Sequence, residues 1–173
     1  MALVFQYGSN TSTARLNGSD QLQNTAGSLG LAITRDDYHL GFTYWSQKIN
    51  CAAADLIPGA GRKIYGVAYE ISEERIYRDK GGGLMTLDEI KGEGSAHRRT
   101  TIEVYLVELP EKPVTAMTYV VKNPQEGLRT DLRYVEHIFR GLREHEAPEE
   151  YIEYVKQRTA ASNPELVAAI RDL

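Results

Sequence analysis

Short apolar runs bounded by glycine and polar residues dominate the first three quarters of the chain, a pattern typical of β-strands. The run "LVFQY" near the start ends at Gly8, which favours a buried first strand. The stretch "KIYGVAYEIS" alternates with a period of two, as a strand does. The other strand-like runs are two in "SLGLAITRDDYHLGFTYW", then "TTIEVYLVEL" and "VTAMTYVVK", with a turn predicted at "PEKP". This part of the chain is therefore predicted to be mostly sheet.

The last quarter changes to the three- and four-residue period of an amphipathic helix. In "TDLRYVEHIFRGLREH" the apolar positions are Leu132, Val135, Ile138, Phe139 and Leu142. A second helix is predicted in "PEEYIEYVKQR", because Pro148 and two glutamates suit a helix start. The segment "NPELVAAIRDL" predicts a third helix, with Asn163 as its cap. Earlier in the chain, "STARLN" predicts one helical turn capped by Ser9, Asn10 or Ser12.

One irregular insertion, "YRDKGGGLMTLDEIKGEGSAH", interrupts the strands. Three consecutive glycines stabilise neither a helix nor a strand. The insertion is therefore predicted to be a long flexible loop, and loops of that length in small domains are often functional.

Composition narrows the classes of function. With 173 residues, of which 42% are hydrophobic and 25% charged, the chain suits one globular domain. A net charge of −4 argues against general nucleic-acid binding. Cys51 is the only cysteine, so no disulfide framework is predicted. No signal-like or membrane-spanning run occurs, and a cytoplasmic location is predicted.

Several motifs that would carry metal or nucleophilic chemistry are incomplete. The four histidines show no metal-binding spacing, and "GAGRK" and "DKGGG" lack the remainder of a nucleotide-binding motif. Ser9 and Cys51 have no companion motif, which gives nucleophilic catalysis little support. Zinc chemistry is therefore not expected, and the two glycine segments are better interpreted as turns.

The segment "YGSN" has two interpretations. Gly8 could supply an unusual backbone angle, with Ser9 or Asn10 as a helix cap. The same geometry also presents backbone N–H groups together, which suits a carboxylate. Taken alone, the segment favours the turn and cap.

Acidic residues gather in "LDEIKGEG", where Asp88, Glu89 and Glu93 surround Lys91. A solvated acidic loop is the simpler interpretation of such a cluster. A functional interpretation needs a glutamate in a partly apolar pocket, where desolvation raises its pKa and suits it to proton transfer.

Eight pieces of the sequence occur in a characteristic order up to about Val155. They are "YGSN", "DYHLGF", "PG", "IYGVAYEI", "LDEIKGEG", "HRRTTIEV", "TYV" and "YVEHIFRGLREHEAPEEYIEYV". No single piece is specific, but the ordered set resembles the gamma-glutamylcyclotransferase-like family.

The resemblance implies an α+β fold in a single domain, with helices packed around a small curved or barrel-like mixed β-sheet and a pocket at its open end. Active members cyclise a γ-glutamyl amine or peptide to 5-oxoproline and release the amine, a lyase-type reaction without metal or cofactor. A glutamate takes a proton from the α-ammonium, the freed amine attacks the γ-carbonyl, and the acid protonates the leaving nitrogen. By the same resemblance the substrate-binding residues are Tyr7, Gly8, Ser9, Asn10, Tyr119 and Tyr134.

This sequence departs from the family pattern at the catalytic position. The family motif L-D-x-x-E-G would place its glutamate at Lys91. Glu93 forms the next E-G pair and is predicted as the acid/base residue, with Glu89 as the second choice. The alternative is an inactive relative that binds a small carboxylate-bearing ligand, because an ammonium cannot replace the carboxylate base at neutral pH unless it is strongly desolvated. Arg15, Arg98 and Arg99 could assist anion binding or lie in solvent.

Residues 1–155 are predicted to form the gamma-glutamylcyclotransferase-like domain and residues 156–173 a C-terminal helical extension. The expected partner is the small-molecule substrate, with no nucleic acid and no membrane, and a homodimer stays open. A further hypothesis is an interaction module in which the helix from Asn163 docks a partner protein.

Overall fold

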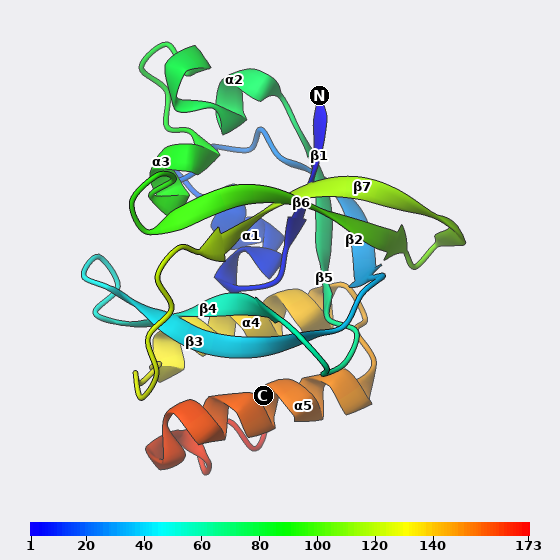
Figure 1. The fold of residues 1–173 in the computed structure, drawn as a ribbon. Helices are drawn as coiled ribbons and strands as arrows, with labels where there is room; N and C mark the ends of the chain where they lie inside the picture. Colours follow the sequence, from blue (N-terminus) through cyan, green and yellow to red (C-terminus); the bar gives the residue numbers. More distant parts are fainter.

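A five-stranded barrel, a separate β-hairpin and two long helices make up the computed structural model, which describes residues 1–173 (Figure 1). The strands are β1 (Ala2–Gln6), β2 (Gly27–Thr34), β3 (Tyr38–Ser46), β4 (Cys51–Pro58), β5 (Tyr65–Ile71), β6 (His97–Leu106) and β7 (Leu109–Val121). The α-helices are α1 (Thr13–Leu16), α2 (Glu73–Ile76), α3 (Leu87–Lys91), α4 (Leu132–Glu144) and α5 (Glu149–Ser162). Three 3-10 turns complete the structure: η1 (Ser9–Thr11), η2 (Arg78–Lys80) and η3 (Pro164–Leu166). No helix is long and apolar enough to span a bilayer.

The barrel closes in the strand order β1-β5-β2-β6-β7. Its neighbouring strands are antiparallel except β1 and β7, which run parallel and meet at Val4 and Met117. Strands β3 and β4 pair only with each other. The predicted α+β domain with a barrel-like mixed sheet is therefore confirmed.

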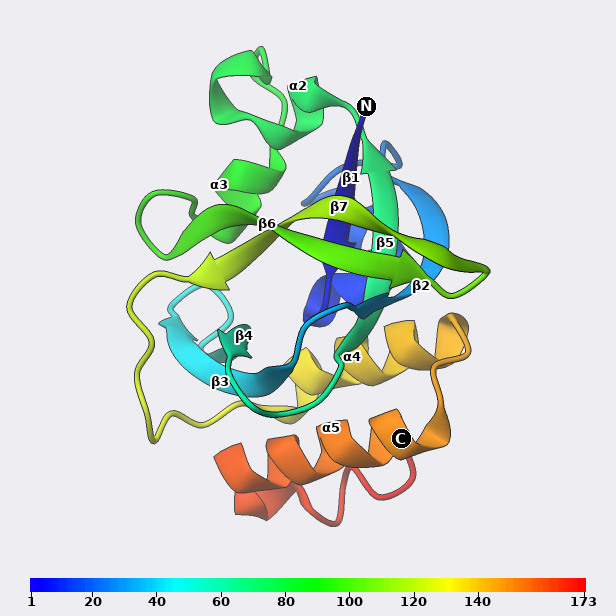
Figure 2. The ribbon, with the colours of Figure 1, turned by 45° about the vertical axis from the view of Figure 1, so that its right-hand side comes forward.

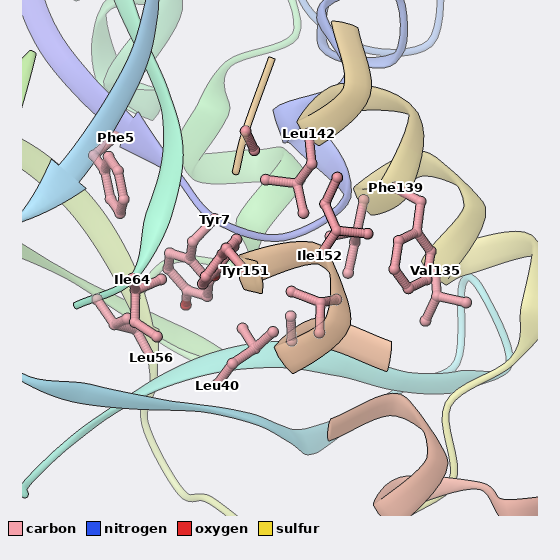
Figure 3. Close-up of a cluster of buried hydrophobic side chains, with 14 of the residues drawn as sticks. Phe5, Tyr7, Leu40, Leu56, Ile64, Val135, Phe139, Leu142, Tyr151 and Ile152 are labelled. Atoms are coloured by element: carbon pink, nitrogen blue, oxygen red, sulfur yellow. The ribbon is translucent and has the colours of Figure 1, made fainter. Parts of the chain in front are cut away.

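Alternation along the strands builds two hydrophobic clusters. Phe5 contributes to a cluster of 26 buried residues, and its neighbour Val4 contributes to a second cluster of 10. The larger cluster joins the barrel to the hairpin and the long helices, and Figure 3 shows Leu40 and Leu56 of the hairpin and Ile152 of α5 among its side chains. The smaller cluster lies against the short helices and includes Leu16, Ile76 and Leu87.

The long helices and the β3–β4 hairpin lie at one end of the barrel, and α2 and α3 lie toward the other (Figures 1 and 2). Helix α4 packs closely against η1 through Gly141. A Cβ atom at Gly141 would overlap the backbone of Thr11 and Ser12, so only glycine permits this approach. The contact fixes the position of the turn that follows β1.

All the predicted strands and both long helices are present, but one further strand was not predicted and one turn is displaced. Strand β4 was not expected, because its sequence "CAAADLIP" is rich in alanine, which has low β-propensity. The turn expected at "PEKP" lies earlier, at Val107 and Glu108, so both prolines fall within β7. A register irregularity between Val104 and Leu106 accompanies this end of the strand pair, and prolines are tolerated at such places.

The predicted flexible loop is partly ordered into η2 and α3. Thr86 caps α3, since its hydroxyl accepts from the Glu89 amide at 3.4 Å while the Glu89 carboxylate accepts from the Thr86 amide at 2.8 Å. At the C-terminus, the helix expected from Asn163 is only the short turn η3, although Asn163 caps it as predicted. The chain then turns so that Ile170 packs into the larger cluster. Helix α5 runs across positions 155 and 156, the predicted domain boundary.

Candidate functional site

A cavity of about 410 Å³ opens where the end of β1 faces the β3–β4 turn and α3. Its walls are residues 6–10 after β1, residues 44–49 at the hairpin and residues 89–92 at the end of α3. Tyr119 from β7 and Tyr134 from α4 also line it. The cavity is referred to below as the main cavity.

The predicted "YGSN" segment forms one wall of the main cavity. Gly8 has φ of −99°, which any residue can adopt, so its role is not an unusual φ. A Cβ atom there would lie 3.1 Å from the Tyr134 hydroxyl and 3.4 Å from the Ala54 Cβ, so glycine keeps this contact open. The Gly8 amide has no hydrogen-bond partner in the chain. Ser12, rather than Ser9 or Asn10, caps α1.

The side chains of the predicted substrate-binding tyrosines, Tyr7, Tyr119 and Tyr134, form hydrogen bonds within the protein. The Tyr7 hydroxyl donates to the Tyr119 carbonyl at 2.6 Å, and burial, with Asp55 adding a smaller effect, raises the pKa of Tyr7. The Tyr119 hydroxyl donates to the Asp88 carboxylate at 2.7 Å. The Tyr134 hydroxyl accepts from the Ala54 amide at 2.9 Å. These side chains shape the cavity, and their predicted contact with substrate stays a prediction.

Lys91 lines the main cavity beside Arg15 and Lys48. None of these three cations forms an ion pair or a side-chain hydrogen bond within the chain. Burial, with a smaller contribution from the positive charge of Arg15, lowers the pKa of Lys91 to about 8. Lys91 is therefore still mostly charged at pH 7, in a place that lacks a counterion.

Buried polar atoms without a partner concentrate around this cavity. Nine such side-chain atoms occur in the chain, and four belong to residues that line the main cavity. They are Gln6 Nε2, Asn10 Oδ1, Arg15 Nε and Gln21 Oε1. Because buried polar groups are nearly always hydrogen-bonded, this concentration is typical of a binding site for a polar ligand.

The two predicted acid/base residues are placed differently. Glu89 lines the cavity, but its carboxylate accepts hydrogen bonds from the Thr86 amide and hydroxyl, which lower its pKa. Glu93 lies outside the lining residues, and its carboxylate is 3.9 Å from Arg99 Nε. The structure therefore places Lys91, and not Glu93, in the lining of the cavity that "YGSN" also lines, and the acid/base roles of both glutamates stay predictions.

Asp88 is the buried carboxylate of this region. It is 3% exposed, lies 3.2 Å from Arg99 Nε, and accepts from the Arg78 amide at 3.2 Å as well as from Tyr119. The partners of Asp88 are therefore structural, and they hold α3 against β6 and β7.

His97 also lines the main cavity, with its Nδ1 2.7 Å from the Lys91 carbonyl oxygen. Burial, reinforced by the Lys91 charge, lowers the pKa of His97 to about 4. Between pH 6.5 and 4 the unfolded chain therefore binds a proton that the folded chain does not, so folding stability falls as pH falls through this window. His137 and His145 also have lowered pKa values and act in the same direction.

We expect the variant His97→Gln to lose less stability on acidification than the wild type. The difference between pH 7 and pH 5 should be on the order of 2 kcal/mol smaller, because the variant has no histidine to protonate at this position. Urea denaturation at both pH values measures it, with His39→Gln as the control. Identical losses in His97→Gln and the wild type would contradict the assigned environment of His97.

Some cavity residues were not found from the sequence. Gln6 could have been noticed as a polar residue inside an apolar strand, and it is 2% exposed. Lys48 carries no such signal, because it lies in a turn whose second strand was not predicted. No group of His, Cys, Asp or Glu side chains is arranged to hold a metal ion.

Comparison with solved structures finds close folds. A protein named "Gamma-glutamyl cyclotransferase" is 25% identical with a TM-score of 0.74, over 90% of this chain and 86% of that one. An uncharacterized protein from Homo sapiens is 26% identical, with the same TM-score and coverage. YkqA from Bacillus subtilis is 21% identical with a TM-score of 0.71, over 92% of this chain and 54% of that one, and shows the fold alone.

A search among curated proteins found no match. The likeness to the gamma-glutamylcyclotransferase-like family that the ordered motifs predicted is confirmed by the structural comparisons. The family model that matches the sequence covers residues 63–155, which is more than half of the chain. The chain therefore belongs to the AIG2-like family.

Proposed function

We propose that the main cavity binds a small carboxylate-bearing molecule of the γ-glutamyl class. The observation that carries this proposal is the group of three cations without a counterion, Lys91, Arg15 and Lys48, in the wall of one cavity. Lys91 and Arg15 are partly buried, whereas Lys48 is exposed, and a charge that is partly removed from water is costly unless it is paired. A ligand carboxylate would supply the missing pair.

The polar groups of residues 6–10, which form another wall of the main cavity, suit the same ligand. The free amide of Gly8 and the unpaired Nε2 of Gln6 can donate to a carboxylate, and the unpaired Oδ1 of Asn10 can accept from an α-ammonium. A γ-glutamyl group carries both of these charges on its α-carbon. The cavity thus offers donors and an acceptor to the two ends of one zwitterionic group.

The second candidate function is cyclisation of that ligand, favoured by the likeness to the protein named "Gamma-glutamyl cyclotransferase". The α-amine would form a bond to the γ-carbonyl carbon, the bond from that carbon to the leaving nitrogen would break, and the proton lost by the amine would pass to the leaving amine. Glu93 or Glu89 would carry the proton. Glu93 would first have to leave Arg99, and Glu89 would have to leave Thr86.

The test is titration calorimetry with γ-glutamylalanine and its isomer α-glutamylalanine, together with a chromatographic assay for 5-oxoproline. We expect the γ-isomer to bind more tightly, and absence of binding by both isomers would overturn the proposal. Product that disappears in Glu93→Gln or Glu89→Gln would establish the second candidate. If the wild type binds without turnover, Lys91→Glu restores the family motif and tests whether the lysine prevents cyclisation.

A further inference from the structure

A second cavity of about 300 Å³ adjoins the main cavity. The two share the lining residues Arg15, Lys48, Ile49 and Tyr134, so they are direct neighbours. The second cavity adds Arg133 and His137 from α4, as well as Asp131, which caps that helix. It is called the side cavity below.

We propose that the ligand is an acidic γ-glutamyl compound, whose amine part carries two carboxylates and extends into the side cavity. This inference rests on the proposed function and specifies its ligand. A γ-glutamyl derivative of an acidic amino acid such as glutamate has this chemistry. A γ-glutamyl derivative of a simple amine does not.

The count of charges supports this ligand. The α-carboxylate and α-ammonium of a γ-glutamyl group cancel, so the group alone leaves the excess of cations uncompensated. Lys91, Arg15 and Lys48 are unpaired, and the only carboxylate in the main cavity, on Glu89, is already engaged by Thr86. The two further carboxylates would give the ligand a net charge of about −2, which offsets two of the three unpaired positive charges.

The side cavity is lined by three cationic side chains and only one carboxylate. Its one carboxylate, on Asp131, accepts from the Tyr134 amide at 2.8 Å and is only 3.6 Å from Arg133. Arg15 Nε and His137 Nδ1 are both buried there without a partner. Burial and the nearby Arg15 lower the pKa of His137, so this ring is a neutral hydrogen-bonding group at pH 7. A carboxylate here would lie in a cavity lined by Arg15, Lys48 and Arg133, of which Lys48 and Arg133 are exposed.

Two ligands of matched size test the inference: γ-glutamylglutamate and γ-glutamylglutamine, which differ by one carboxylate. Titration calorimetry at pH 7 and low salt should show that the wild type binds γ-glutamylglutamate at least tenfold more tightly. The variants Lys48→Gln and Arg133→Gln should each reduce this preference several-fold. The control Arg129→Gln, which removes an exposed arginine paired with Glu165, should retain it.

The outcomes separate the two proposals. Equal affinity for both ligands would overturn the acidic-ligand inference and leave the proposed function standing. A preference that survives in both Lys48→Gln and Arg133→Gln would overturn the assignment of the side cavity. Failure of both ligands and of γ-glutamylalanine to bind would overturn the proposed function and this inference with it.

Discussion

Replacing Lys91 with glutamine is expected to lower the affinity of the main cavity for γ-glutamyl ligands at least tenfold. Glutamine keeps a similar length but removes the charge that a ligand carboxylate would pair with, and charge-assisted hydrogen bonds of this kind are worth about 1.5–3 kcal/mol. Titration calorimetry at pH 7 measures the change. Lys112→Gln, an exposed lysine on β7, is the control and should bind as the wild type does.

The same variant has a distinctive pH dependence. Since the pKa of Lys91 is lowered to about 8, the lysine is mostly charged at pH 6.5 and half charged near pH 8. Only the charged form attracts a carboxylate, so wild-type affinity should fall between pH 6.5 and 8.5, while that of Lys91→Gln should change less. Parallel pH profiles for the two proteins would show that Lys91 does not contact the ligand.

Replacing Asp88 with alanine is expected to cost about 3 kcal/mol of folding stability. The change leaves the buried Tyr119 hydroxyl and the Arg78 amide without a hydrogen-bond acceptor, and it removes the nearest counterion of Arg99. Urea denaturation measures the effect. The control is Asp79→Ala, at an exposed position in η2 without hydrogen bonds. A loss below about 1 kcal/mol would mean that these contacts are not the ones that hold α3 in place.

The periodic parts of the fold could be predicted because their patterns are local. The alternating "KIYGVAYEIS" became β5, and the apolar stripe that includes Val135 and Phe139 became α4. Strand β4 could not be predicted in the same way, since its alanines pair with β3 through tertiary context and not through intrinsic preference. Helix α3 was not predicted either. It depends on a cap at Thr86, and the three glycines that precede this residue favoured a loop.

The candidate site was only partly predictable, for a different reason. The "YGSN" segment taken alone favoured a turn and cap, and only its place in the ordered set of family motifs predicted it as part of a site. Arg15, Lys48 and Lys91 come from α1, the β3–β4 turn and α3, and only the folded barrel brings them together. Spacing along the chain also could not decide between Lys91 and Glu93, since α3 ends at Lys91 and the left-handed Gly92 turns the chain before Glu93.

The hydrogen bonds from Tyr7 to Tyr119 and from Tyr119 to Asp88 join the turn after β1 to the helix that bears Lys91. Two walls of the main cavity are thus linked through buried bonds across β7, and neither can shift without breaking one. A receptor of this kind is preorganised: its ligand need not order a loop, and little of the binding free energy is lost as conformational entropy. Affinity differences among ligands should then appear chiefly in their dissociation rates, with association governed by diffusion and charge.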